Sequence, residues 1–374
     1  MFARMPILLL TDWLSKASPV TRFRLSMTVH RSGILAVILC LGLSAPALAG
    51  EAAASTRRPT GKKLTLAQAK GKKTYSAASA RARRASVARS RAAAQARALR
   101  EAQEPRYKLD ANGALVPDLR AEAAIIYDSA TGHVLWELNS RNQRSIASIT
   151  KVMTAAVFME DSPNLSDTVV VDPSDVRAAS TTYLRAGYQV TKGDLLHLTL
   201  IASDNGAARA LARVSKYGSD GFIKRMNDKA RELSLTNTSY ADPSGLLSEN
   251  VSSAYDMARL ITYVSGDDRI AGVMRKQNYS VDVGRRVINI HSTNQLVMKG
   301  EYDVQAGKTG FIRSAGYCLA TLLKLPSGPE VAVVVLGAKS NQGRFWETRH
   351  LVNWVATKAS DLLSSPAEAA TTAN

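Results

Sequence analysis

The sequence predicts an α+β domain in which helices cover an antiparallel sheet. Three observations favour this class: two β-rich segments come first, an all-helical middle follows, and further strands precede a long last helix. The 374 residues are 45% hydrophobic and 21% charged, which suffices for one large domain or two ordinary ones. The composition excludes collagenous, disulfide-rich and globally disordered chains.

The first expected elements are two strands, 123–127 and 134–138, joined by a Gly-containing turn. Residues 148–159 are apolar on nearly every side, which predicts a helix at the centre of the domain. The remaining expectations are a strand at 168–171, helices at 194–202, 206–214, 221–233 and 254–264, strands at 284–290, 302–307, 317–325 and 330–337, and a helix at 343–363.

Two N-terminal segments are expected to lie outside the domain at 105–363. Residues 1–49 are predicted to be a cleaved secretory signal peptide, with an apolar run followed by an Ala-x-Ala end, so the protein is expected to be periplasmic. The long stretch before this run favours translation from Met27. Residues 50–104, rich in Ala, Arg, Lys and Ser, are predicted to be a disordered basic linker in which 77–103 favours helix locally. A polar tail is expected at 364–374.

The basic charge belongs to the N-terminal part of the chain. The first hundred residues hold 19 of the 49 lysines and arginines but only Asp12 and Glu51 of the 31 acids, which leaves 30 basic and 29 acidic residues for the rest. The folded part is therefore nearly neutral, and no nucleic-acid partner is expected. Residues 51–104 either form a solvated spacer or hold an anionic partner such as an envelope surface.

Metal chemistry is not indicated. Two cysteines exclude a disulfide framework and a cysteine-built metal site, and no His-Glu-x-x-His pair indicates a zinc peptidase. We therefore expect no metal and no cofactor. Cys318, in an apolar run, is expected to be a buried core thiol.

Lys151 is the only charged residue in the apolar stretch 149–159, and it follows Ser148 by three positions, on the same face of a helix. Burial favours the neutral form of a lysine, and a neutral amine beside a hydroxyl can act as a general base beside a nucleophile. The alternative is that Ser148 merely caps the helix while Lys151 reaches solvent.

Two further polar elements stand at expected boundaries. Ser203-Asp204-Asn205 lies between two helices, where it could equally be a capping turn. Lys308-Thr309-Gly310 follows a predicted strand, where the Lys and Thr could hold a carboxylate while the strand edge pairs with a peptide, or could form a solvated strand end.

Ser-x-x-Lys, Ser-Asp-Asn and Lys-Thr-Gly occur here in the order and context of the penicillin-recognising serine acyl-enzymes. Over about residues 115–360 the chain resembles the low-molecular-mass penicillin-binding proteins, which are D-alanyl-D-alanine carboxypeptidases and endopeptidases. Supporting segments are 117–121, 146–153, 242–246 and 306–311. The resemblance implies a β-lactamase/transpeptidase-like fold, in which helices and a helical subdomain flank a five-stranded antiparallel sheet. It also implies peptidoglycan stem peptides as substrates and β-lactams as inhibitors.

The resemblance gives roles to the first two motifs. Ser148 forms the acyl-enzyme, and Lys151 accepts its proton. Ser203 relays a proton to the leaving group, and Asn205 positions the substrate amide.

The third motif completes the implied site. Lys308 and Thr309 bind the terminal carboxylate, and the backbone N–H groups of Ser148 and Phe311 form the oxyanion hole. A free lysine has a pKa near 10.4, so Lys151 is a useful base at neutral pH only if burial or a second ammonium lowers its pKa. We expect Lys308 to be that second ammonium.

Three alternatives remain open at this point. A class A β-lactamase shares the motifs but needs a glutamate that residues 233–240 lack, so slow deacylation is expected. A D-Ala-D-Ala carboxypeptidase is less favoured than a cross-link endopeptidase, because no further β-rich domain or amphipathic anchor follows the last predicted helix. A non-catalytic protein that binds the envelope through residues 51–104 is the third.

Overall fold

The computed structural model describes residues 77–284, 286–326 and 328–364. The predicted signal peptide, the linker up to residue 76 and the tail after Ser364 lie outside these residues. Helix α1 (Ala77–Gln103) occupies the rest of the linker, and its described side chains are exposed. Over this stretch, where the sequence favours helix locally, the structure has a continuous helix, because Ala and Arg have high helix propensity.

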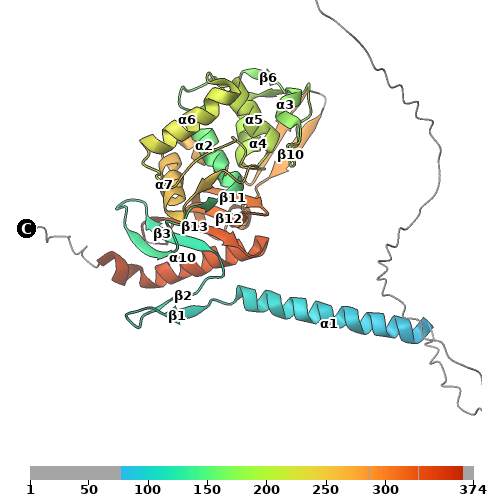
Figure 1. Cartoon of the computed structure of the whole chain (residues 1–374), viewed down its shortest axis with the longest axis vertical. Coiled ribbons are helices and arrows are strands. Elements are labelled where there is room, and N and C mark those ends of the chain that lie inside the picture. The colour runs from blue at the N-terminus through green and yellow to red at the C-terminus, as the bar shows by residue number, and fades with distance from the viewer. Residues whose placement is uncertain (1–76, 285, 327, 365–374) are drawn as a thin grey trace, which may run out of the picture. The chain divides into compact units, whose positions relative to one another are not determined.

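A five-stranded sheet forms the centre of the domain (Figure 1), and every neighbouring pair of its strands is antiparallel. This arrangement confirms the predicted fold class. In spatial order the strands are β11 (Asp303–Ile312), β12 (Gly316–Lys324), β13 (Glu330–Ala338), β3 (Ala123–Asp128) and β4 (Val134–Leu138).

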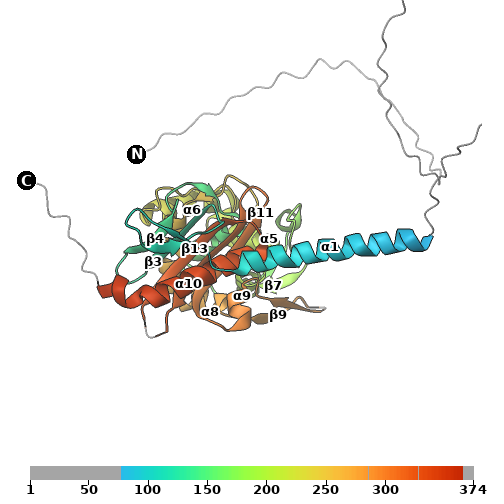
Figure 2. The ribbon, with the colours of Figure 1, turned by 90° about the horizontal axis from the view of Figure 1, so that it is seen from below.

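Both faces of the sheet are buried, which explains the nearly continuous apolar runs of its inner strands. Side chains alternate along a strand, so Ala332 and Val334 of β13 face one layer while Val331 and Val333 face the other. Helix α7 (Ala254–Ser265) packs on the first face of the sheet. Helix α10 (Asn341–Ser364) lies across the second (Figure 2).

The helical layer holds the apolar helix α2 (Thr150–Phe158), which contacts α4, α5, α6 and α7 and has no exposed residue. A 3₁₀ turn at Ala147–Ile149 precedes it. The other helices are α3 (Pro173–Val176), α4 (Lys192–Leu200), α5 (Asn205–Val214), α6 (Gly218–Glu232), α8 (Asp268–Met274) and α9 (Gln295–Lys299). No helix of the described ranges is both long and apolar enough to cross a membrane.

Short strand pairs complete the fold, and two strands of the molecule differ from the expected elements. The predicted strand 284–290 is the second half of a hairpin, and Gly284, with φ +83°, lies in its turn. Strand β11 continues to Ile312, so Lys308 lies within it and not after it. The pairs are β1 (Tyr107–Leu109) with β2 (Leu115–Pro117), β5 (Arg144–Ser145) with β8 (Val251–Ser252), β6 (Thr168–Val170) with β7 (Gln189–Thr191), and β9 (Asn278–Asp282) with β10 (Val287–His291).

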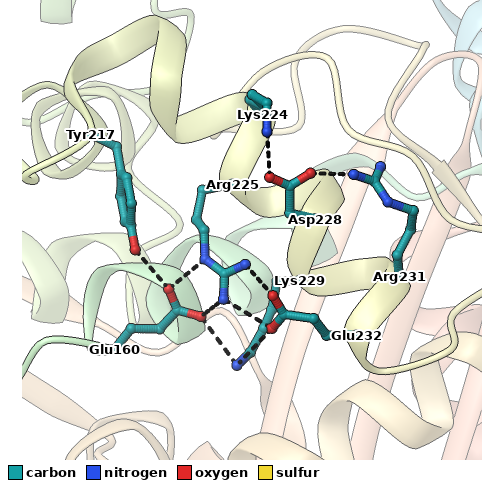
Figure 3. A network of polar contacts seen from close by, with 8 residues as sticks. All are labelled: Glu160, Tyr217, Lys224, Arg225, Asp228, Lys229, Arg231 and Glu232. Carbon is teal, nitrogen blue, oxygen red and sulfur yellow. Dashed lines mark hydrogen bonds and ion pairs between the residues drawn. The ribbon is translucent and has the colours of Figure 1, made fainter.

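An ion network joins the end of α2 to α6 (Figure 3). Glu160 accepts from Arg225 and lies 3.1 Å from the Lys229 ammonium, and Arg225 also pairs with Glu232. The side chains of Glu160, Arg225 and Lys229 are each less than one-fifth exposed. We call these four residues the α2–α6 ion network.

Candidate active site

The three sequence motifs converge on one cleft of about 530 Å³ between the β11 edge and the helical layer. A volume of this size accommodates a drug-sized ligand. Its lining includes Ser148, Ser203, Asn205, Thr309 and Phe311, and the side chain of Lys308 reaches Ser203 from beneath. The lysine amines lie below the cleft surface, because Lys151 is 0% and Lys308 1% exposed.

Lys151 lies directly below Ser148. Its Nζ is 3.0 Å from Ser148 Oγ, 2.6 Å from Asn205 Oδ1 and 2.5 Å from the Ser244 carbonyl oxygen. Neither the 3₁₀ turn nor α2 has a side-chain N-cap hydrogen bond, so Ser148 does not act as a cap. The alternative in which Lys151 extends to solvent is likewise wrong.

The segment 242–247 shapes the floor under Lys151. Asp242 accepts hydrogen bonds from the backbone N–H groups of Ser244, Gly245 and Leu247, which aims the Ser244 carbonyl at the amine. Gly245 has φ +81°, and a Cβ there would stand 2.1 Å from the Ala147 carbonyl oxygen. Only glycine therefore lets this loop pack against the backbone that carries Ser148.

Burial dominates the electrostatics of the Lys151 amine. Burial lowers the pKa of Lys151 to about 7. The negative charges of Asp204 and Asp242 oppose this shift, and the positive charge of Arg209 adds to it. Burial also holds the pKa of Lys308 well below its usual value, and the charges of Lys151 and Arg344 lower it further. The expectation that Lys308 lowers the pKa of Lys151 needs correction, because burial is the main cause of this pKa shift.

The Ser203–Asn205 turn is both a cap and a wall of the cleft. Asp204 caps α5 by accepting from Ala207 N–H, as the capping alternative required. Its neighbours face the cleft instead: Ser203, at φ +60°, accepts from Lys308 Nζ at 2.8 Å, and Asn205 Oδ1 accepts from Lys151. A left-handed φ in a non-glycine residue costs conformational energy and recurs at functional sites.

Lys308 and Thr309 lie on the edge strand of the sheet beside this turn. Lys308 Nζ donates to Ser203 Oγ and, at 3.0 Å, to the Thr309 carbonyl. Thr309 Oγ1 lies 2.6 Å from Thr293 Oγ1. With Lys308 1% and Thr309 4% exposed, the solvated-strand-end alternative is wrong.

β11 passes unusually close to the nucleophile turn. A Cβ on Gly310 would stand 2.6 Å from the Ile146 carbonyl oxygen and 3.2 Å from the Ser148 backbone nitrogen. The amide of Ser148 therefore lies against the strand one residue before Phe311. Glycine at 310 permits this approach, which is a packing reason for the third residue of the Lys-Thr-Gly motif.

Arg344 lines the cleft, although no sequence motif predicted it as a site residue. From α10 its guanidinium donates to the carbonyls of Gly310 and Cys318 at 3.0 and 3.2 Å, which ties the β11 edge to β12. Burial lowers the pKa of Arg344 to about 10. Cys318 itself is buried, as expected, and its thiol is free.

The cleft lining contains no aspartate or glutamate among the residues that the structure describes. Nor does any group of three or more His, Cys, Asp or Glu side chains in the described ranges offer a metal site. The chemistry that the arrangement can perform is therefore that of hydroxyls, amines and backbone N–H groups.

Comparison with known proteins places these motifs in one family. A family model described as D-alanyl-D-alanine carboxypeptidase matches residues 110–340. The chain is 32% identical over 255 residues to the D-alanyl-D-alanine endopeptidase of Pseudomonas aeruginosa, which covers 65% of this chain and 79% of that protein. It is 32% identical over 252 residues to the endopeptidase of the same name from Escherichia coli, with 66% and 81% covered. The crystal structure of the Streptomyces K15 DD-transpeptidase superposes with a TM-score of 0.59 at 26% identity, covering 64% of this chain and 97% of that one.

Proposed function

This chain belongs to the D-alanyl-D-alanine carboxypeptidase family, and we propose that it is a serine DD-peptidase that cleaves D-alanyl bonds in peptidoglycan peptides. Membership confirms the resemblance that the three motifs indicated. The observation that carries the proposal is the fully buried Lys151 amine 3.0 Å from Ser148 Oγ.

The partners of Lys151 support its role as the general base. Carbonyl oxygens only accept hydrogen bonds, so the two N–H groups of a neutral amine go to Asn205 Oδ1 and the Ser244 carbonyl. The nitrogen lone pair is then left for the Ser148 hydroxyl. Lys151 takes the hydroxyl proton while Ser148 Oγ bonds to the D-alanyl carbonyl carbon of the scissile bond.

Collapse of the tetrahedral intermediate breaks the scissile C–N bond and needs a proton on the leaving amine. Ser203 is placed to relay to this amine the proton that Lys151 took from Ser148, because its hydroxyl can donate toward the cleft while its oxygen accepts from Lys308. Asn205 keeps one N–H for the substrate amide, since its other N–H donates to the Ala179 carbonyl.

Lys308 and Thr309 bind the carboxylate that follows the scissile bond, and the Ser148 and Phe311 N–H groups stabilise the oxyanion. The close contact of Gly310 with the Ser148 amide supports this second assignment, because it brings the two backbone segments together. Water then attacks the acyl-enzyme, releases the shortened peptide and restores the Ser148 hydroxyl.

β-Lactams are expected to acylate Ser148 and remain bound. Class A β-lactamases use a positioned glutamate to activate the deacylating water. The described cleft lining lacks any carboxylate, which supports an inhibited acyl-enzyme over rapid turnover.

The first test is mass spectrometry of the intact protein after penicillin treatment. We expect an increase by one penicillin mass, and none in Ser148→Ala. Rapid turnover of nitrocefin would contradict the peptidase in favour of a β-lactamase, and no covalent labelling would favour the non-catalytic envelope protein.

Within the family we propose endopeptidase action on cross-links. Both curated relatives above bear the name endopeptidase. Purified cross-linked muropeptide dimers are the test: release of monomers is expected, whereas loss of a terminal D-Ala alone would identify a carboxypeptidase.

We also propose that the protein is exported to the periplasm and that its basic segment holds an anionic envelope surface. The described part of that segment, α1, carries seven arginines and one glutamate. Co-sedimentation of the native chain with purified cell walls, compared with a chain lacking 77–103, tests the second proposal. Equal sedimentation would contradict it.

A further inference from the structure

Arg313 lines the catalytic cleft without a role in the mechanism above. It follows the last residue of β11, and its side chain is exposed. Within the part of the chain that the structure describes, this side chain makes no ion pair and no hydrogen bond. A free guanidinium at the mouth of a cleft is available to a ligand.

The other basic side chains at the cleft are already engaged. Arg344 donates to two backbone carbonyls and to Asn341, and Lys308 donates to Ser203 and Thr309. The described lining holds no carboxylate to neutralise Arg313. The field at this end of the cleft therefore favours an anionic group.

The course of β11 indicates which part of the substrate lies there. In the proposed function, on which this inference rests, Thr309 meets the carboxylate after the scissile bond and Phe311 the scissile carbonyl. The strand runs on from Phe311 to Ile312, and Arg313 opens the turn that follows, so Arg313 lines the cleft beyond Phe311, on the acyl side. This is the side of the donor peptide and of the acyl substituent of a penicillin.

The neighbouring surface suits the same substrate. The Phe311 ring is 50% exposed and stacks on Tyr317 at a centroid separation of 4.2 Å, which gives the acyl chain an apolar support. An anionic substituent extending past this support comes within reach of Arg313.

We propose that Arg313 is a specificity-determining residue that selects donors with a free carboxylate on the acyl side of the scissile bond. A guanidinium binds a carboxylate through two parallel hydrogen bonds, which an amide in the same place cannot reproduce. The ligand class is an acidic stem peptide, as opposed to one whose carboxylate is amidated.

Two penicillins that differ by one carboxylate provide the test. Carbenicillin carries a carboxylate on the acyl side chain that benzylpenicillin lacks. We measure the acylation rate constant for each and compare their ratio in the native protein, Arg313→Gln and Arg313→Lys. Arg313→Gln should lower the carbenicillin-to-benzylpenicillin ratio by up to about fivefold, the most that an exposed ion pair commonly provides, and Arg313→Lys should keep part of it.

Lys324→Gln is the matched control, because it removes one exposed positive charge from the opposite end of β12. Its ratio should equal that of the native protein. Added salt should reduce the native ratio toward that of Arg313→Gln. A synthetic donor ending in D-Ala-D-Ala, with its preceding side-chain carboxylate free or amidated, should show the same dependence on Arg313.

The outcomes separate this inference from the proposed function. If both penicillins acylate the protein and Arg313→Gln leaves the ratio unchanged, Arg313 does not select for a carboxylate. If neither penicillin acylates the native protein, the serine-peptidase function fails and the inference fails with it.

Discussion

The catalytic cleft and the α2–α6 ion network both shield lysines from solvent, fully in the cleft and largely in the network, but the partners of these lysines differ. In the network, burial lowers the pKa of Lys229, but the hydrogen bonds and charges of Tyr263 and Glu160 together outweigh it, and the net effect raises this pKa. In the cleft, the nearest partners of Lys151 are a hydroxyl, an amide oxygen and a carbonyl oxygen, and burial lowers its pKa to about 7. Carboxylate partners fix a charge, whereas neutral partners leave an amine able to exchange a proton.

The two regions also differ in whether their charged groups stabilise the fold or serve the reaction. Glu160 and its partners stabilise the junction of α2 with α6, and carboxylates hold the charges of Arg225 and Lys229. The cleft holds two buried amines without a directly bonded carboxylate, an arrangement that disfavours the charged form and suits function.

The largest expected difference comes from removing one lysine from each region. Lys151→Met should slow acylation by fluorescent penicillin about 10²- to 10⁴-fold, the contribution of a general base, because methionine fills the space without a lone pair of suitable basicity. Lys229→Met should acylate at the native rate. An equal loss of acylation rate in both variants, or no loss in Lys151→Met, would contradict the comparison. Thermal unfolding of each variant checks that it is folded.

A glycine pair tests whether close packing holds the cleft amine. Gly245 and Gly187 both have left-handed φ values, +81° and +83°, but only at Gly245 would a Cβ meet backbone atoms. Gly245→Ala should displace the Ser148 turn and slow acylation by about 100-fold, since small misplacements of reacting groups have effects of that order. Gly187→Ala carries the backbone strain alone and should acylate normally. Similar rates for the two variants would contradict the packing argument.

The pH dependence of acylation sharpens the account of Lys151. The base must be neutral, so the rate should rise with pH, reach half its maximum near pH 7 and fall about tenfold per pH unit well below it. Because burial is the main cause of the shift, the midpoint in Lys308→Met should stay near that of the native protein. A midpoint that rises by a unit or more would restore Lys308 as the source of the depression.

The smallest effect belongs to the network. Glu160→Gln should lower the free energy of unfolding by about 1 to 2 kcal/mol, between the values of exposed and buried pairs, and leave acylation unchanged. Burial opposes the shift, but Arg225 and Lys229 lower the pKa of Glu160 below 4.5. Its stabilisation is thus present above pH 4.5 and lost as the pH falls through the folded-state pKa. Urea denaturation should show the native and variant curves converging in acid.

Several site contacts lay beyond sequence reasoning, because they join segments far apart in the chain. The Ser244 carbonyl and Arg344 reach the cleft from a loop and from the last helix, and neither belongs to the three motifs. The turn at 242–246 carried a usable signal, since an Asp two residues before Ser and three before Gly favours a loop closed on its own backbone. Arg344 carried none.

Errors in the strand boundaries have a related cause. The strand was expected to end at Gly307, but β11 continues to Ile312, and Gly307 and Gly310 lie within it where a side chain or another backbone approaches. Gly284 was expected within a strand and instead forms the turn of the β9–β10 hairpin. A glycine marks an unusual backbone position, and only the neighbouring segments decide which kind it is.

The sequence alone determined the α+β class, the order of the elements and the three motifs, because periodicity and short spacings are local properties of the chain. Only the tertiary structure decided that the Lys151 amine is buried, that its partners besides Ser148 are carbonyl oxygens, and that Arg313 has no partner among the described residues. The burial and the charge partners of a side chain depend on which segments, distant in the sequence, pack around it. The packing of the sheet against the helical layer determines which segments these are.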